Sequence, residues 1–249
     1  MTAGPAAASG PGAGDGAGPA PSPLPDLDEV VRRLAAVRAR IAAAGVDPAA
    51  VTVVGVTKGK PPPVVALALA AGLVDLGENY AQELLDKVRW CEDGRPDGPL
   101  PRWHAIGRLQ RNKVRALAPY VAVWQTLDRP ELVDEVARRA PGARVLVQVN
   151  GTDEADKGGC APGEVAALVD RAAGAGLRVE GLMTVGPTDP DRDPRIGFEL
   201  VRGLVDRLGL TVCSMGMTDD LEAAVACGST MVRIGTALFG PRQARPVRD

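Results

Sequence analysis

Aromatic side chains are scarce in this sequence, because Phe, Trp and Tyr together make up only 3% of its 249 residues. A hydrophobic core must therefore be built from Val, Leu, Ile and Ala, as in α/β proteins with buried parallel strands. An excess of charge of either sign is lacking as well, since 29 Lys and Arg accompany 31 Asp and Glu. The formal net charge of -2 gives no overall attraction to nucleic acid or to an anionic membrane, and we expect neither as a partner.

Cysteine and histidine are too few and too scattered for a metal site. The four cysteines, Cys91, Cys160, Cys213 and Cys227, contain no C-x-x-C pair, and His104 is the only histidine. These absences argue against a zinc site, a disulfide framework and, without a G-x-S-x-G motif, a serine triad. No apolar run reaches the roughly 18 residues that cross a membrane. We expect reduced thiols, a cytoplasmic location, no metal and a structural role for His104.

The first 25 residues consist almost entirely of Ala, Gly and Pro with a few Ser. Such a segment cannot bury enough apolar surface to offset the entropy of ordering, so residues 1–25 are predicted to be a disordered tail. From Asp26 to Ile41, apolar residues recur at helical spacing, which predicts an extra helix before the first strand. We expect a single domain over residues 26–249.

Strand and helix patterns alternate through the rest of the chain. Strands are predicted at 51–57, 73–77, 102–106, 121–126, 143–149, 177–185, 210–215 and 230–235, and helices at 63–72, 79–90, 109–118, 130–140, 162–174, 195–209 and 218–227. Eight strands alternating with helices at this length predict a closed (β/α)₈ TIM-type barrel. An open doubly wound sheet is the alternative, but no G-x-G-x-x-G follows the first strand and no P-loop sequence is present.

Barrel sites lie at the carboxyl ends of the strands, so the residues found there are the candidates. They are Lys58, Glu78, Asn79, Gly107, Gln125, Thr126, Asn150, Thr184, Ser214, Gly216, Arg233, Gly235 and Thr236. Lys58 ends the first strand, where a lysine either simply reaches solvent or serves as a functional amine. Arg233 shares a strand face with Met231, so we expect it to point into the barrel, toward an anion or an internal ion pair.

The turns after the seventh and eighth strands have the sequences CSMGMTD (213–219) and RIGTALFG (233–240). Their glycines, hydroxyls and short helix starts indicate a phosphate site, because free N–H groups and the positive end of a helix dipole face the anion there. A phosphate on one side of the barrel mouth and Lys58 across it would suit a phosphorylated aldehyde, for which pyridoxal 5'-phosphate is the obvious candidate.

Several long segments, in order, carry a family resemblance over residues 27–242. They are VGVTKGKP (54–61), DLGENYAQELLDK (75–87), WHAIGRLQRNKVR (103–115), VLVQVN (145–150), GLMTVGP (181–187) and SMGMTDDLEAAVACGSTMVRIGTALFGPR (214–242). With them the chain resembles the pyridoxal phosphate homeostasis protein family, whose members are single-domain barrels similar to the amino-terminal half of alanine racemase.

The resemblance implies a role for each residue of the predicted cofactor site. Lys58 would carry pyridoxal 5'-phosphate as a Schiff base, and Arg233 would face the pyridine nitrogen. Asn79 and Met183 would lie against the cofactor. The residues assigned to the phosphate and its turns are Ser214, Gly216, Gly235 and Thr236.

Three functions follow from this site as hypotheses. The first is a carrier that sequesters pyridoxal 5'-phosphate and delivers it to apo-enzymes that depend on it, without substantial catalysis. An arginine at the ring nitrogen weakens the electron sink, and we expect the second domain that supplies a tyrosine base to related racemases to be absent from a chain that ends at Asp249. The alternatives are a racemase-like enzyme that uses Lys58 as a base, and a barrel isomerase that acts on a phosphorylated metabolite without a cofactor.

Overall fold

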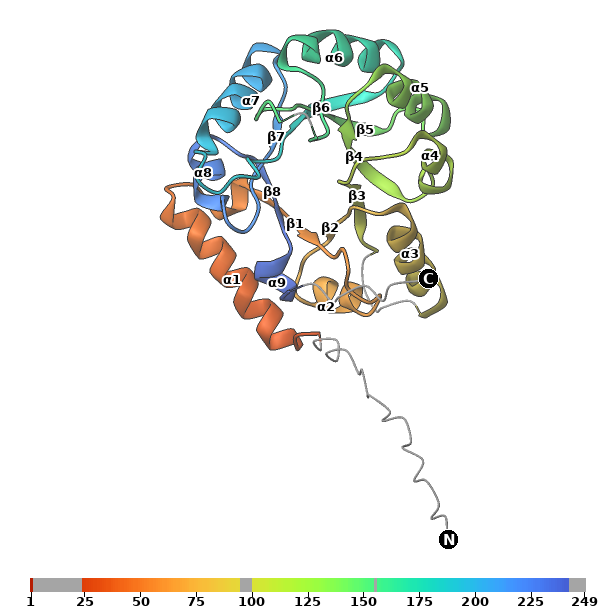
Figure 1. Cartoon of the computed structure of the whole chain (residues 1–249), viewed down its shortest axis with the longest axis vertical. Coiled ribbons are helices and arrows are strands. Elements are labelled where there is room, and N and C mark those ends of the chain that lie inside the picture. The colour runs from red at the N-terminus through yellow and green to blue at the C-terminus, as the bar shows by residue number, and fades with distance from the viewer. Residues whose placement is uncertain (2–23, 95–99, 155, 242–249) are drawn as a thin grey trace.

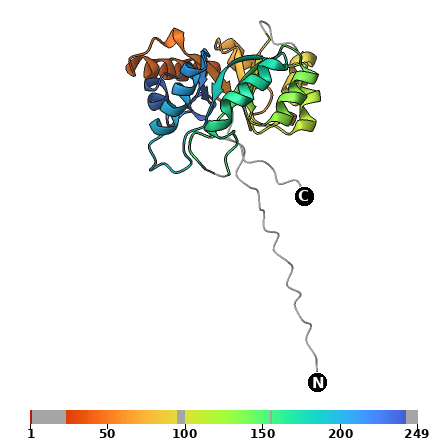
Figure 2. The same ribbon diagram turned by 90° about the horizontal axis from the view of Figure 1, so that it is seen from above.

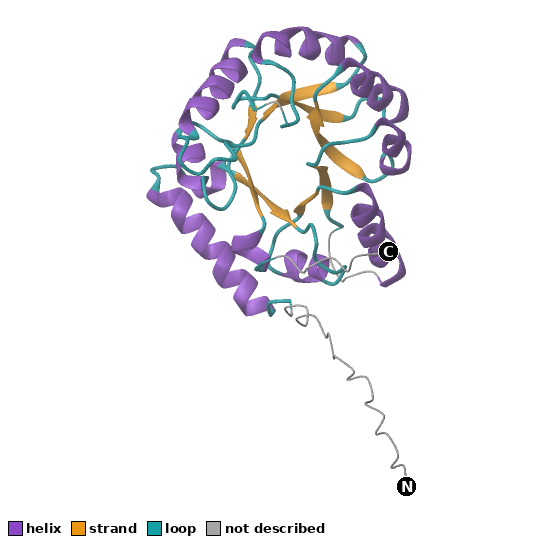
Figure 3. Cartoon of the chain, in the orientation of Figure 1, coloured by secondary structure: helices purple, strands orange, loops and turns teal. Residues whose placement is uncertain are grey.

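The computed structural model describes residues 1, 24–94, 100–154 and 156–241. In that part of the chain, eight parallel strands form one closed barrel in sequential order, and β8 pairs with β1 to complete the ring (Figures 1 and 3). They are β1 (Thr52–Val56), β2 (Asp75–Glu78), β3 (Arg102–Ala105), β4 (Val121–Leu127), β5 (Arg144–Gln148), β6 (Arg178–Met183), β7 (Val212–Ser214) and β8 (Met231–Ile234). The predicted (β/α)₈ barrel is confirmed, and the open doubly wound sheet is wrong.

Helices surround the ring of strands (Figure 3). They are α1 (Leu27–Ala43), α2 (Val64–Ala70), α3 (Ala81–Gly94), α4 (Arg111–Leu117), α5 (Pro130–Arg139), α6 (Val165–Gly174), α7 (Arg195–Arg207), α8 (Leu221–Ala226) and α9 (Thr236–Phe239), with 3₁₀ turns η1 (Pro48–Ala50) and η2 (Pro162–Glu164). Among the described residues, no helix combines the length and the apolar character that crossing a membrane requires. The predicted disordered tail lies almost wholly outside the described residues.

The helix before the first strand, α1, packs on the outside of the barrel beside α8 and α9 (Figures 1 and 2). The carboxylate of Asp26 accepts a hydrogen bond from the Glu29 N–H at 2.7 Å and so caps its first turn. The guanidinium of Arg40 donates to the Glu222 carboxylate and, at 2.8 Å, to the carbonyl of Thr218. This helix therefore supports the turn that follows β7.

Two apolar regions hold the fold together. The larger one fills the layer between the strands and the helices, and the smaller one lies inside the barrel. The buried members of the inner cluster are Val54, Val123, Leu146, Met183 and Met231. Because side chains alternate along a strand, Arg233 shares the inward face of β8 with Met231, as predicted.

Element boundaries differ from the predicted ones mainly where turn chemistry intervenes. The helix predicted at 218–227 begins at Leu221, because the Asp220 carboxylate accepts a hydrogen bond from the Met217 N–H at 2.6 Å and holds a loop before it. The helix predicted at 162–174 opens with the 3₁₀ turn η2. The first strand ends at Val56, so Lys58 lies just beyond the strand, in the turn that leads to α2.

Candidate functional site

A pocket of about 390 Å³ lies at the carboxyl end of the barrel, where the turns after the strands meet. Five of the eight predicted site residues line it, namely Lys58, Asn79, Arg233, Gly235 and Thr236. The lining residues that the sequence did not single out include Val56, Ile106, Val185, Met217 and Asp219. Four of these are apolar, and nothing in the sequence distinguishes an apolar side chain at a pocket wall from one in the core.

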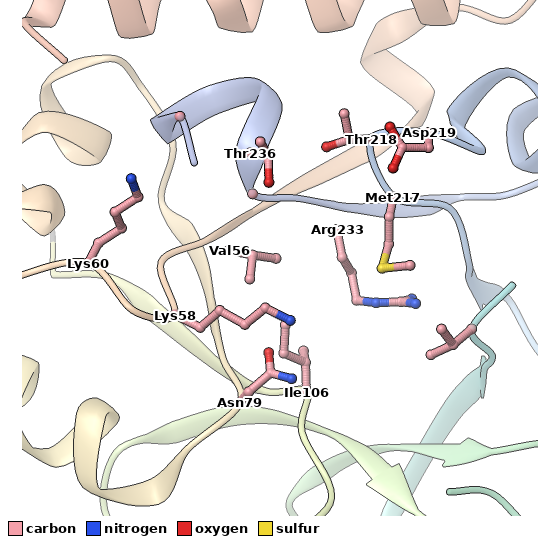
Figure 4. Close-up of a pocket in the computed structure, with 13 residues that line it drawn as sticks. Val56, Lys58, Lys60, Asn79, Ile106, Met217, Thr218, Asp219, Arg233 and Thr236 are labelled. Carbon is pink, nitrogen blue, oxygen red and sulfur yellow. The ribbon is translucent and has the colours of Figure 1, made fainter. Parts of the chain in front are cut away.

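The side chain of Lys58 enters the pocket from the turn after β1 and that of Arg233 from β8, and both extend toward its centre (Figure 4). The amine of Lys60 points away from Lys58 in the same view and donates a hydrogen bond to the Pro241 carbonyl. Burial, and to a lesser degree the charge of Arg33, lowers the pKa of Lys60. Both lysines line the pocket, and Lys58 is the one whose amine extends toward its centre.

A buried ion pair supports the turn that carries Lys58. The Lys87 ammonium pairs with the Glu78 carboxylate, and both side chains are almost fully buried. The same ammonium donates to the Thr57 carbonyl at 2.9 Å, while the Thr57 hydroxyl donates to Glu78. On the other side of Lys58, the Gly59 N–H donates to the Glu83 carboxylate at 2.7 Å. The residues on both sides of Lys58 are thus held by fixed charged groups.

Arg233 is buried, with 4% of its surface exposed, and among the described residues it hydrogen-bonds only to neutral acceptors. Its guanidinium donates to the Ser214 hydroxyl at 2.8 Å and to the Thr184 carbonyl at 2.7 Å. Burial lowers the pKa of Arg233 to about 10, so it stays cationic at neutral pH. It forms no salt bridge with any described carboxylate, and the predicted internal ion pair is therefore not found. The guanidinium can therefore donate a hydrogen bond to a neutral acceptor or to an anion in the pocket.

The turns after β7 and β8 form the opposite wall. Thr218, Gly235 and Thr236 line the pocket, and the Ala237 N–H lies 3.4 Å from the Thr218 hydroxyl, which connects the two turns. Gly216 stands outside the lining but shapes its turn: its φ is +95°, and an added Cβ would approach the Ala224 Cβ to 2.6 Å.

Two predicted residues, Ser214 and Met183, lie inside the barrel rather than at the pocket surface. The Ser214 hydroxyl is fully buried, accepts from Arg233 and donates to Gln125, so it has no access to a phosphate in the pocket. The predicted phosphate contact of Ser214 does not fit this placement. Met183 belongs to the inner apolar cluster and does not line the pocket.

Asn79 is an unsatisfied polar residue in the pocket wall. Its side-chain oxygen is buried and makes no hydrogen bond within the described part of the chain. Buried acceptors without a donor are costly, which is why such an atom in a concave site indicates a ligand. A cofactor with hydroxyl or imine N–H groups would satisfy it.

Gly107 offers a test of how closely this wall is packed. A Cβ added to Gly107 would lie 2.2 Å from the Asn79 carbonyl oxygen, so Gly107→Ala must displace Asn79. We expect the variant to lose about 1–3 kcal/mol of stability in urea unfolding, as overpacked sites do, together with ligand affinity. Gly174→Ala is the control, because nothing lies within 4 Å of the added Cβ there. Equal stability and affinity in both variants would show that the wall adapts.

This fold and pocket define a barrel of the alanine racemase amino-terminal type, and residues 26–243 match the family described as "Alanine racemase, N-terminal domain". The chain is 41% identical over 224 residues to the pyridoxal phosphate homeostasis protein of Pseudomonas aeruginosa, covering 86% of this chain and 95% of that protein. With that of Escherichia coli it shares 38% identity over 236 residues, which is 87% of this chain and 98% of the other. The chain belongs to the pyridoxal phosphate homeostasis protein family.

A solved structure agrees with this assignment. PipY of Synechococcus elongatus with pyridoxal phosphate bound superimposes with a TM-score of 0.72 at 27% identity, covering 85% of this chain and all of that one. The same protein without the cofactor gives a TM-score of 0.75. The predicted family is confirmed.

Proposed function

We propose that this chain binds pyridoxal 5'-phosphate as a Schiff base on Lys58 and serves cytoplasmic pyridoxal phosphate homeostasis by sequestration and delivery, without substantial catalysis. The observation that carries the proposal is the placement of Lys58 and Arg233 in one pocket of a barrel that belongs to this family. PipY, a structural neighbour, binds pyridoxal phosphate, and the curated relatives are named for its homeostasis.

The residues present fit this cofactor. The unsatisfied oxygen of Asn79 needs a donor, and the Arg233 guanidinium, which has no described carboxylate partner, suits an unprotonated pyridine nitrogen. Thr218, Gly235 and Thr236 offer hydroxyl and backbone groups for the phosphate on the wall formed by the last two turns. When bound, pyridoxal 5'-phosphate supplies an aldehyde and an electron-withdrawing ring.

Lys58 performs the covalent step in this proposal. Its uncharged amine adds to the aldehyde carbon, the nitrogen loses its protons as the double bond forms, and the aldehyde oxygen leaves as water. The fixed neighbours Thr57 and Gly59 hold the backbone that carries Lys58, which reduces the entropy lost on attachment. Delivery is the reverse reaction, in which water restores the aldehyde and the amine.

Weak catalysis follows from the same residues. The Arg233 cation disfavours a proton on the ring nitrogen, so the ring accepts electrons poorly. The described pocket wall contains no tyrosine or histidine, which leaves Lys58 as the main candidate for moving a substrate proton. A single lysine that must also release the cofactor cannot easily transfer protons on both faces of a substrate.

The delivery role can be tested by transfer. We expect the purified protein loaded with pyridoxal 5'-phosphate to restore activity to an apo-enzyme that depends on this cofactor, in proportion to the loaded protein added. Lys58→Ala, treated identically, should transfer nothing beyond loosely bound cofactor. Failure to reactivate several such apo-enzymes would contradict the delivery role and leave storage of the cofactor as the remaining role. Racemisation, decarboxylation or transamination of common amino acids, lost in Lys58→Ala, would favour the racemase-like alternative.

A further inference from the structure

Arg233 is the first member of a hydrogen-bonded chain that crosses the inside of the barrel. Its Nη1 donates to Ser214 Oγ at 2.8 Å, and Ser214 Oγ lies 2.7 Å from Gln125 Oε1. Gln125 Nε2 lies 2.7 Å from Nδ1 of His104, whose Nε2 lies 3.0 Å from Oδ1 of Asp75. All five residues are buried. We refer to them as the Arg233–Asp75 chain.

The hydrogen bonds in this chain all run in one direction, from Arg233 toward Asp75. A guanidinium can only donate, so Ser214 Oγ accepts from Arg233, and in the structure it gives its own proton to Gln125 Oε1. This fixes the amide of Gln125 with its NH₂ group toward His104. Nδ1 of His104 is then an acceptor without a proton, and the ring proton is on Nε2, where it is donated to Asp75.

The chain ends on a carboxylate that is held as an anion. Burial raises the pKa of Asp75, but hydrogen bonds from His104 and Arg102 outweigh burial and bring the pKa below its ordinary value. Arg102 adds a two-point contact from the outer side, at 2.8 Å for its Nε. Hydrogen bonds aligned in one direction toward an anion polarise one another, which makes Ser214 Oγ a stronger acceptor for Arg233.

We propose that Gln125, His104 and Asp75 are positioning residues for Arg233. By holding Ser214 Oγ as an acceptor, they keep the guanidinium in one orientation, with its remaining N–H groups directed to the ring nitrogen of the cofactor. The proposal rests on the proposed binding of pyridoxal 5'-phosphate. It assigns a role to the single histidine of the chain and accounts for the burial of four polar side chains beside the apolar cluster inside the barrel.

The first test needs no cofactor. His104 is the only histidine, so nitrogen-15 spectra of the imidazole report one side chain without assignment. We expect the proton on Nε2 and a bare Nδ1 in the wild type and in the control Thr126→Val, whose buried hydroxyl makes no hydrogen bond within the described residues. In Gln125→Glu the carboxylate can only accept, so His104 should carry a proton on both nitrogens. A proton on Nδ1 in the wild type would refute the proposed direction.

The second test asks whether the chain acts on the ring nitrogen. The probes are pyridoxal 5'-phosphate and its analogue with C–H in place of that nitrogen. Gln125→Met removes the amide contacts with Ser214, His104 and Met231 at similar volume. The preference for the cofactor over the analogue should fall roughly tenfold or more, as expected for one hydrogen bond to a charged group. Gln125→Glu, which keeps the acceptor for Ser214, and Thr126→Val should retain the preference.

The outcomes separate this inference from the proposed function. An equal loss of affinity for both probes in Gln125→Met would mean that the chain only stabilises the barrel, and the positioning role would be wrong. Failure of the wild type to bind pyridoxal 5'-phosphate at all would refute the proposed function, while the spectra of His104 would still decide the direction of the chain.

Discussion

Lys58→Ala is expected to abolish covalent attachment of pyridoxal 5'-phosphate. In the wild type, borohydride should reduce the Schiff base to a stable secondary amine, and peptide mapping by mass spectrometry should place the added mass on Lys58. In the variant no other described amine is directed to the centre of the pocket, since Lys60 points away and is engaged by the Pro241 carbonyl. The loss should therefore be complete rather than partial.

Lys60→Ala is the matched control for this experiment, because the two lysines share one turn. It should keep the reducible attachment and the visible absorbance of the bound cofactor. The assignment would be wrong if the wild-type label mapped to Lys60, or if Lys58→Ala still became labelled at another lysine after reduction.

Lys87→Met is expected to cause the largest loss of stability among the changes considered. It leaves the Glu78 carboxylate buried without its cation and removes the donor to the Thr57 carbonyl. Breaking a buried ion pair by removing one partner costs about 3–5 kcal/mol, which urea unfolding can measure. Because Thr57 precedes Lys58, cofactor affinity should fall as well. Arg138→Met breaks an exposed salt bridge and should change the free energy of unfolding far less.

The pH dependence of the stability of Lys87→Met identifies the cause of its loss of stability. Burial raises the pKa of Glu78, and the charge and hydrogen bond of Lys87 oppose that effect. Without Lys87, the pKa of Glu78 in the folded state rises further above its value in the unfolded state. Protonated Glu78 therefore favours folding, and this contribution to stability is lost as the pH rises through the folded-state pKa. The deficit relative to the wild type should therefore shrink toward acidic pH. Glu78→Gln combined with Lys87→Met should recover part of the loss, and a deficit independent of pH would contradict this account.

The fold could be predicted from sequence because its signals are local. Runs such as 51–57 and 143–149 are β-branched and apolar, and the helices between the strands carry an apolar stripe, so the alternation is visible without knowledge of distant contacts. Boundaries were less certain where a side chain caps a loop, as Asp220 does before α8. To predict that the ring closes, the count of eight strands had to be combined with the chain length.

The site was predictable only as far as residue type and strand-end position determine it. Lys58, Asn79 and Arg233 stand out because polar groups follow apolar strands at the mouth of a barrel. Whether Ser214 faces the pocket or the barrel interior depends on which residue accepts the hydrogen bond from its hydroxyl. That residue, Gln125, is 89 residues away in sequence, so local sequence does not reveal it. Lys87 lies on a helix among Glu83 and Asp86 and has the pattern of a solvated face, so its burial was not foreseen.

The packing of α1 on α8 and α9 has a consequence for synthesis on the ribosome. Of the described helices α1 is made first, and besides α2 and η1 it packs on α8 and α9, which are made last. In the same way β1 waits for β8 to complete the ring. Until then the apolar face formed by Val30, Leu34, Val37 and Ile41 lacks its packing against α8 and α9 and is open to chaperones. The pocket, which takes Lys58 from the first turn and Arg233 from the last strand, is complete only when the ring closes. Capture of the cofactor by the newly made chain therefore reports that translation has passed β8 and that the two ends of the barrel have met.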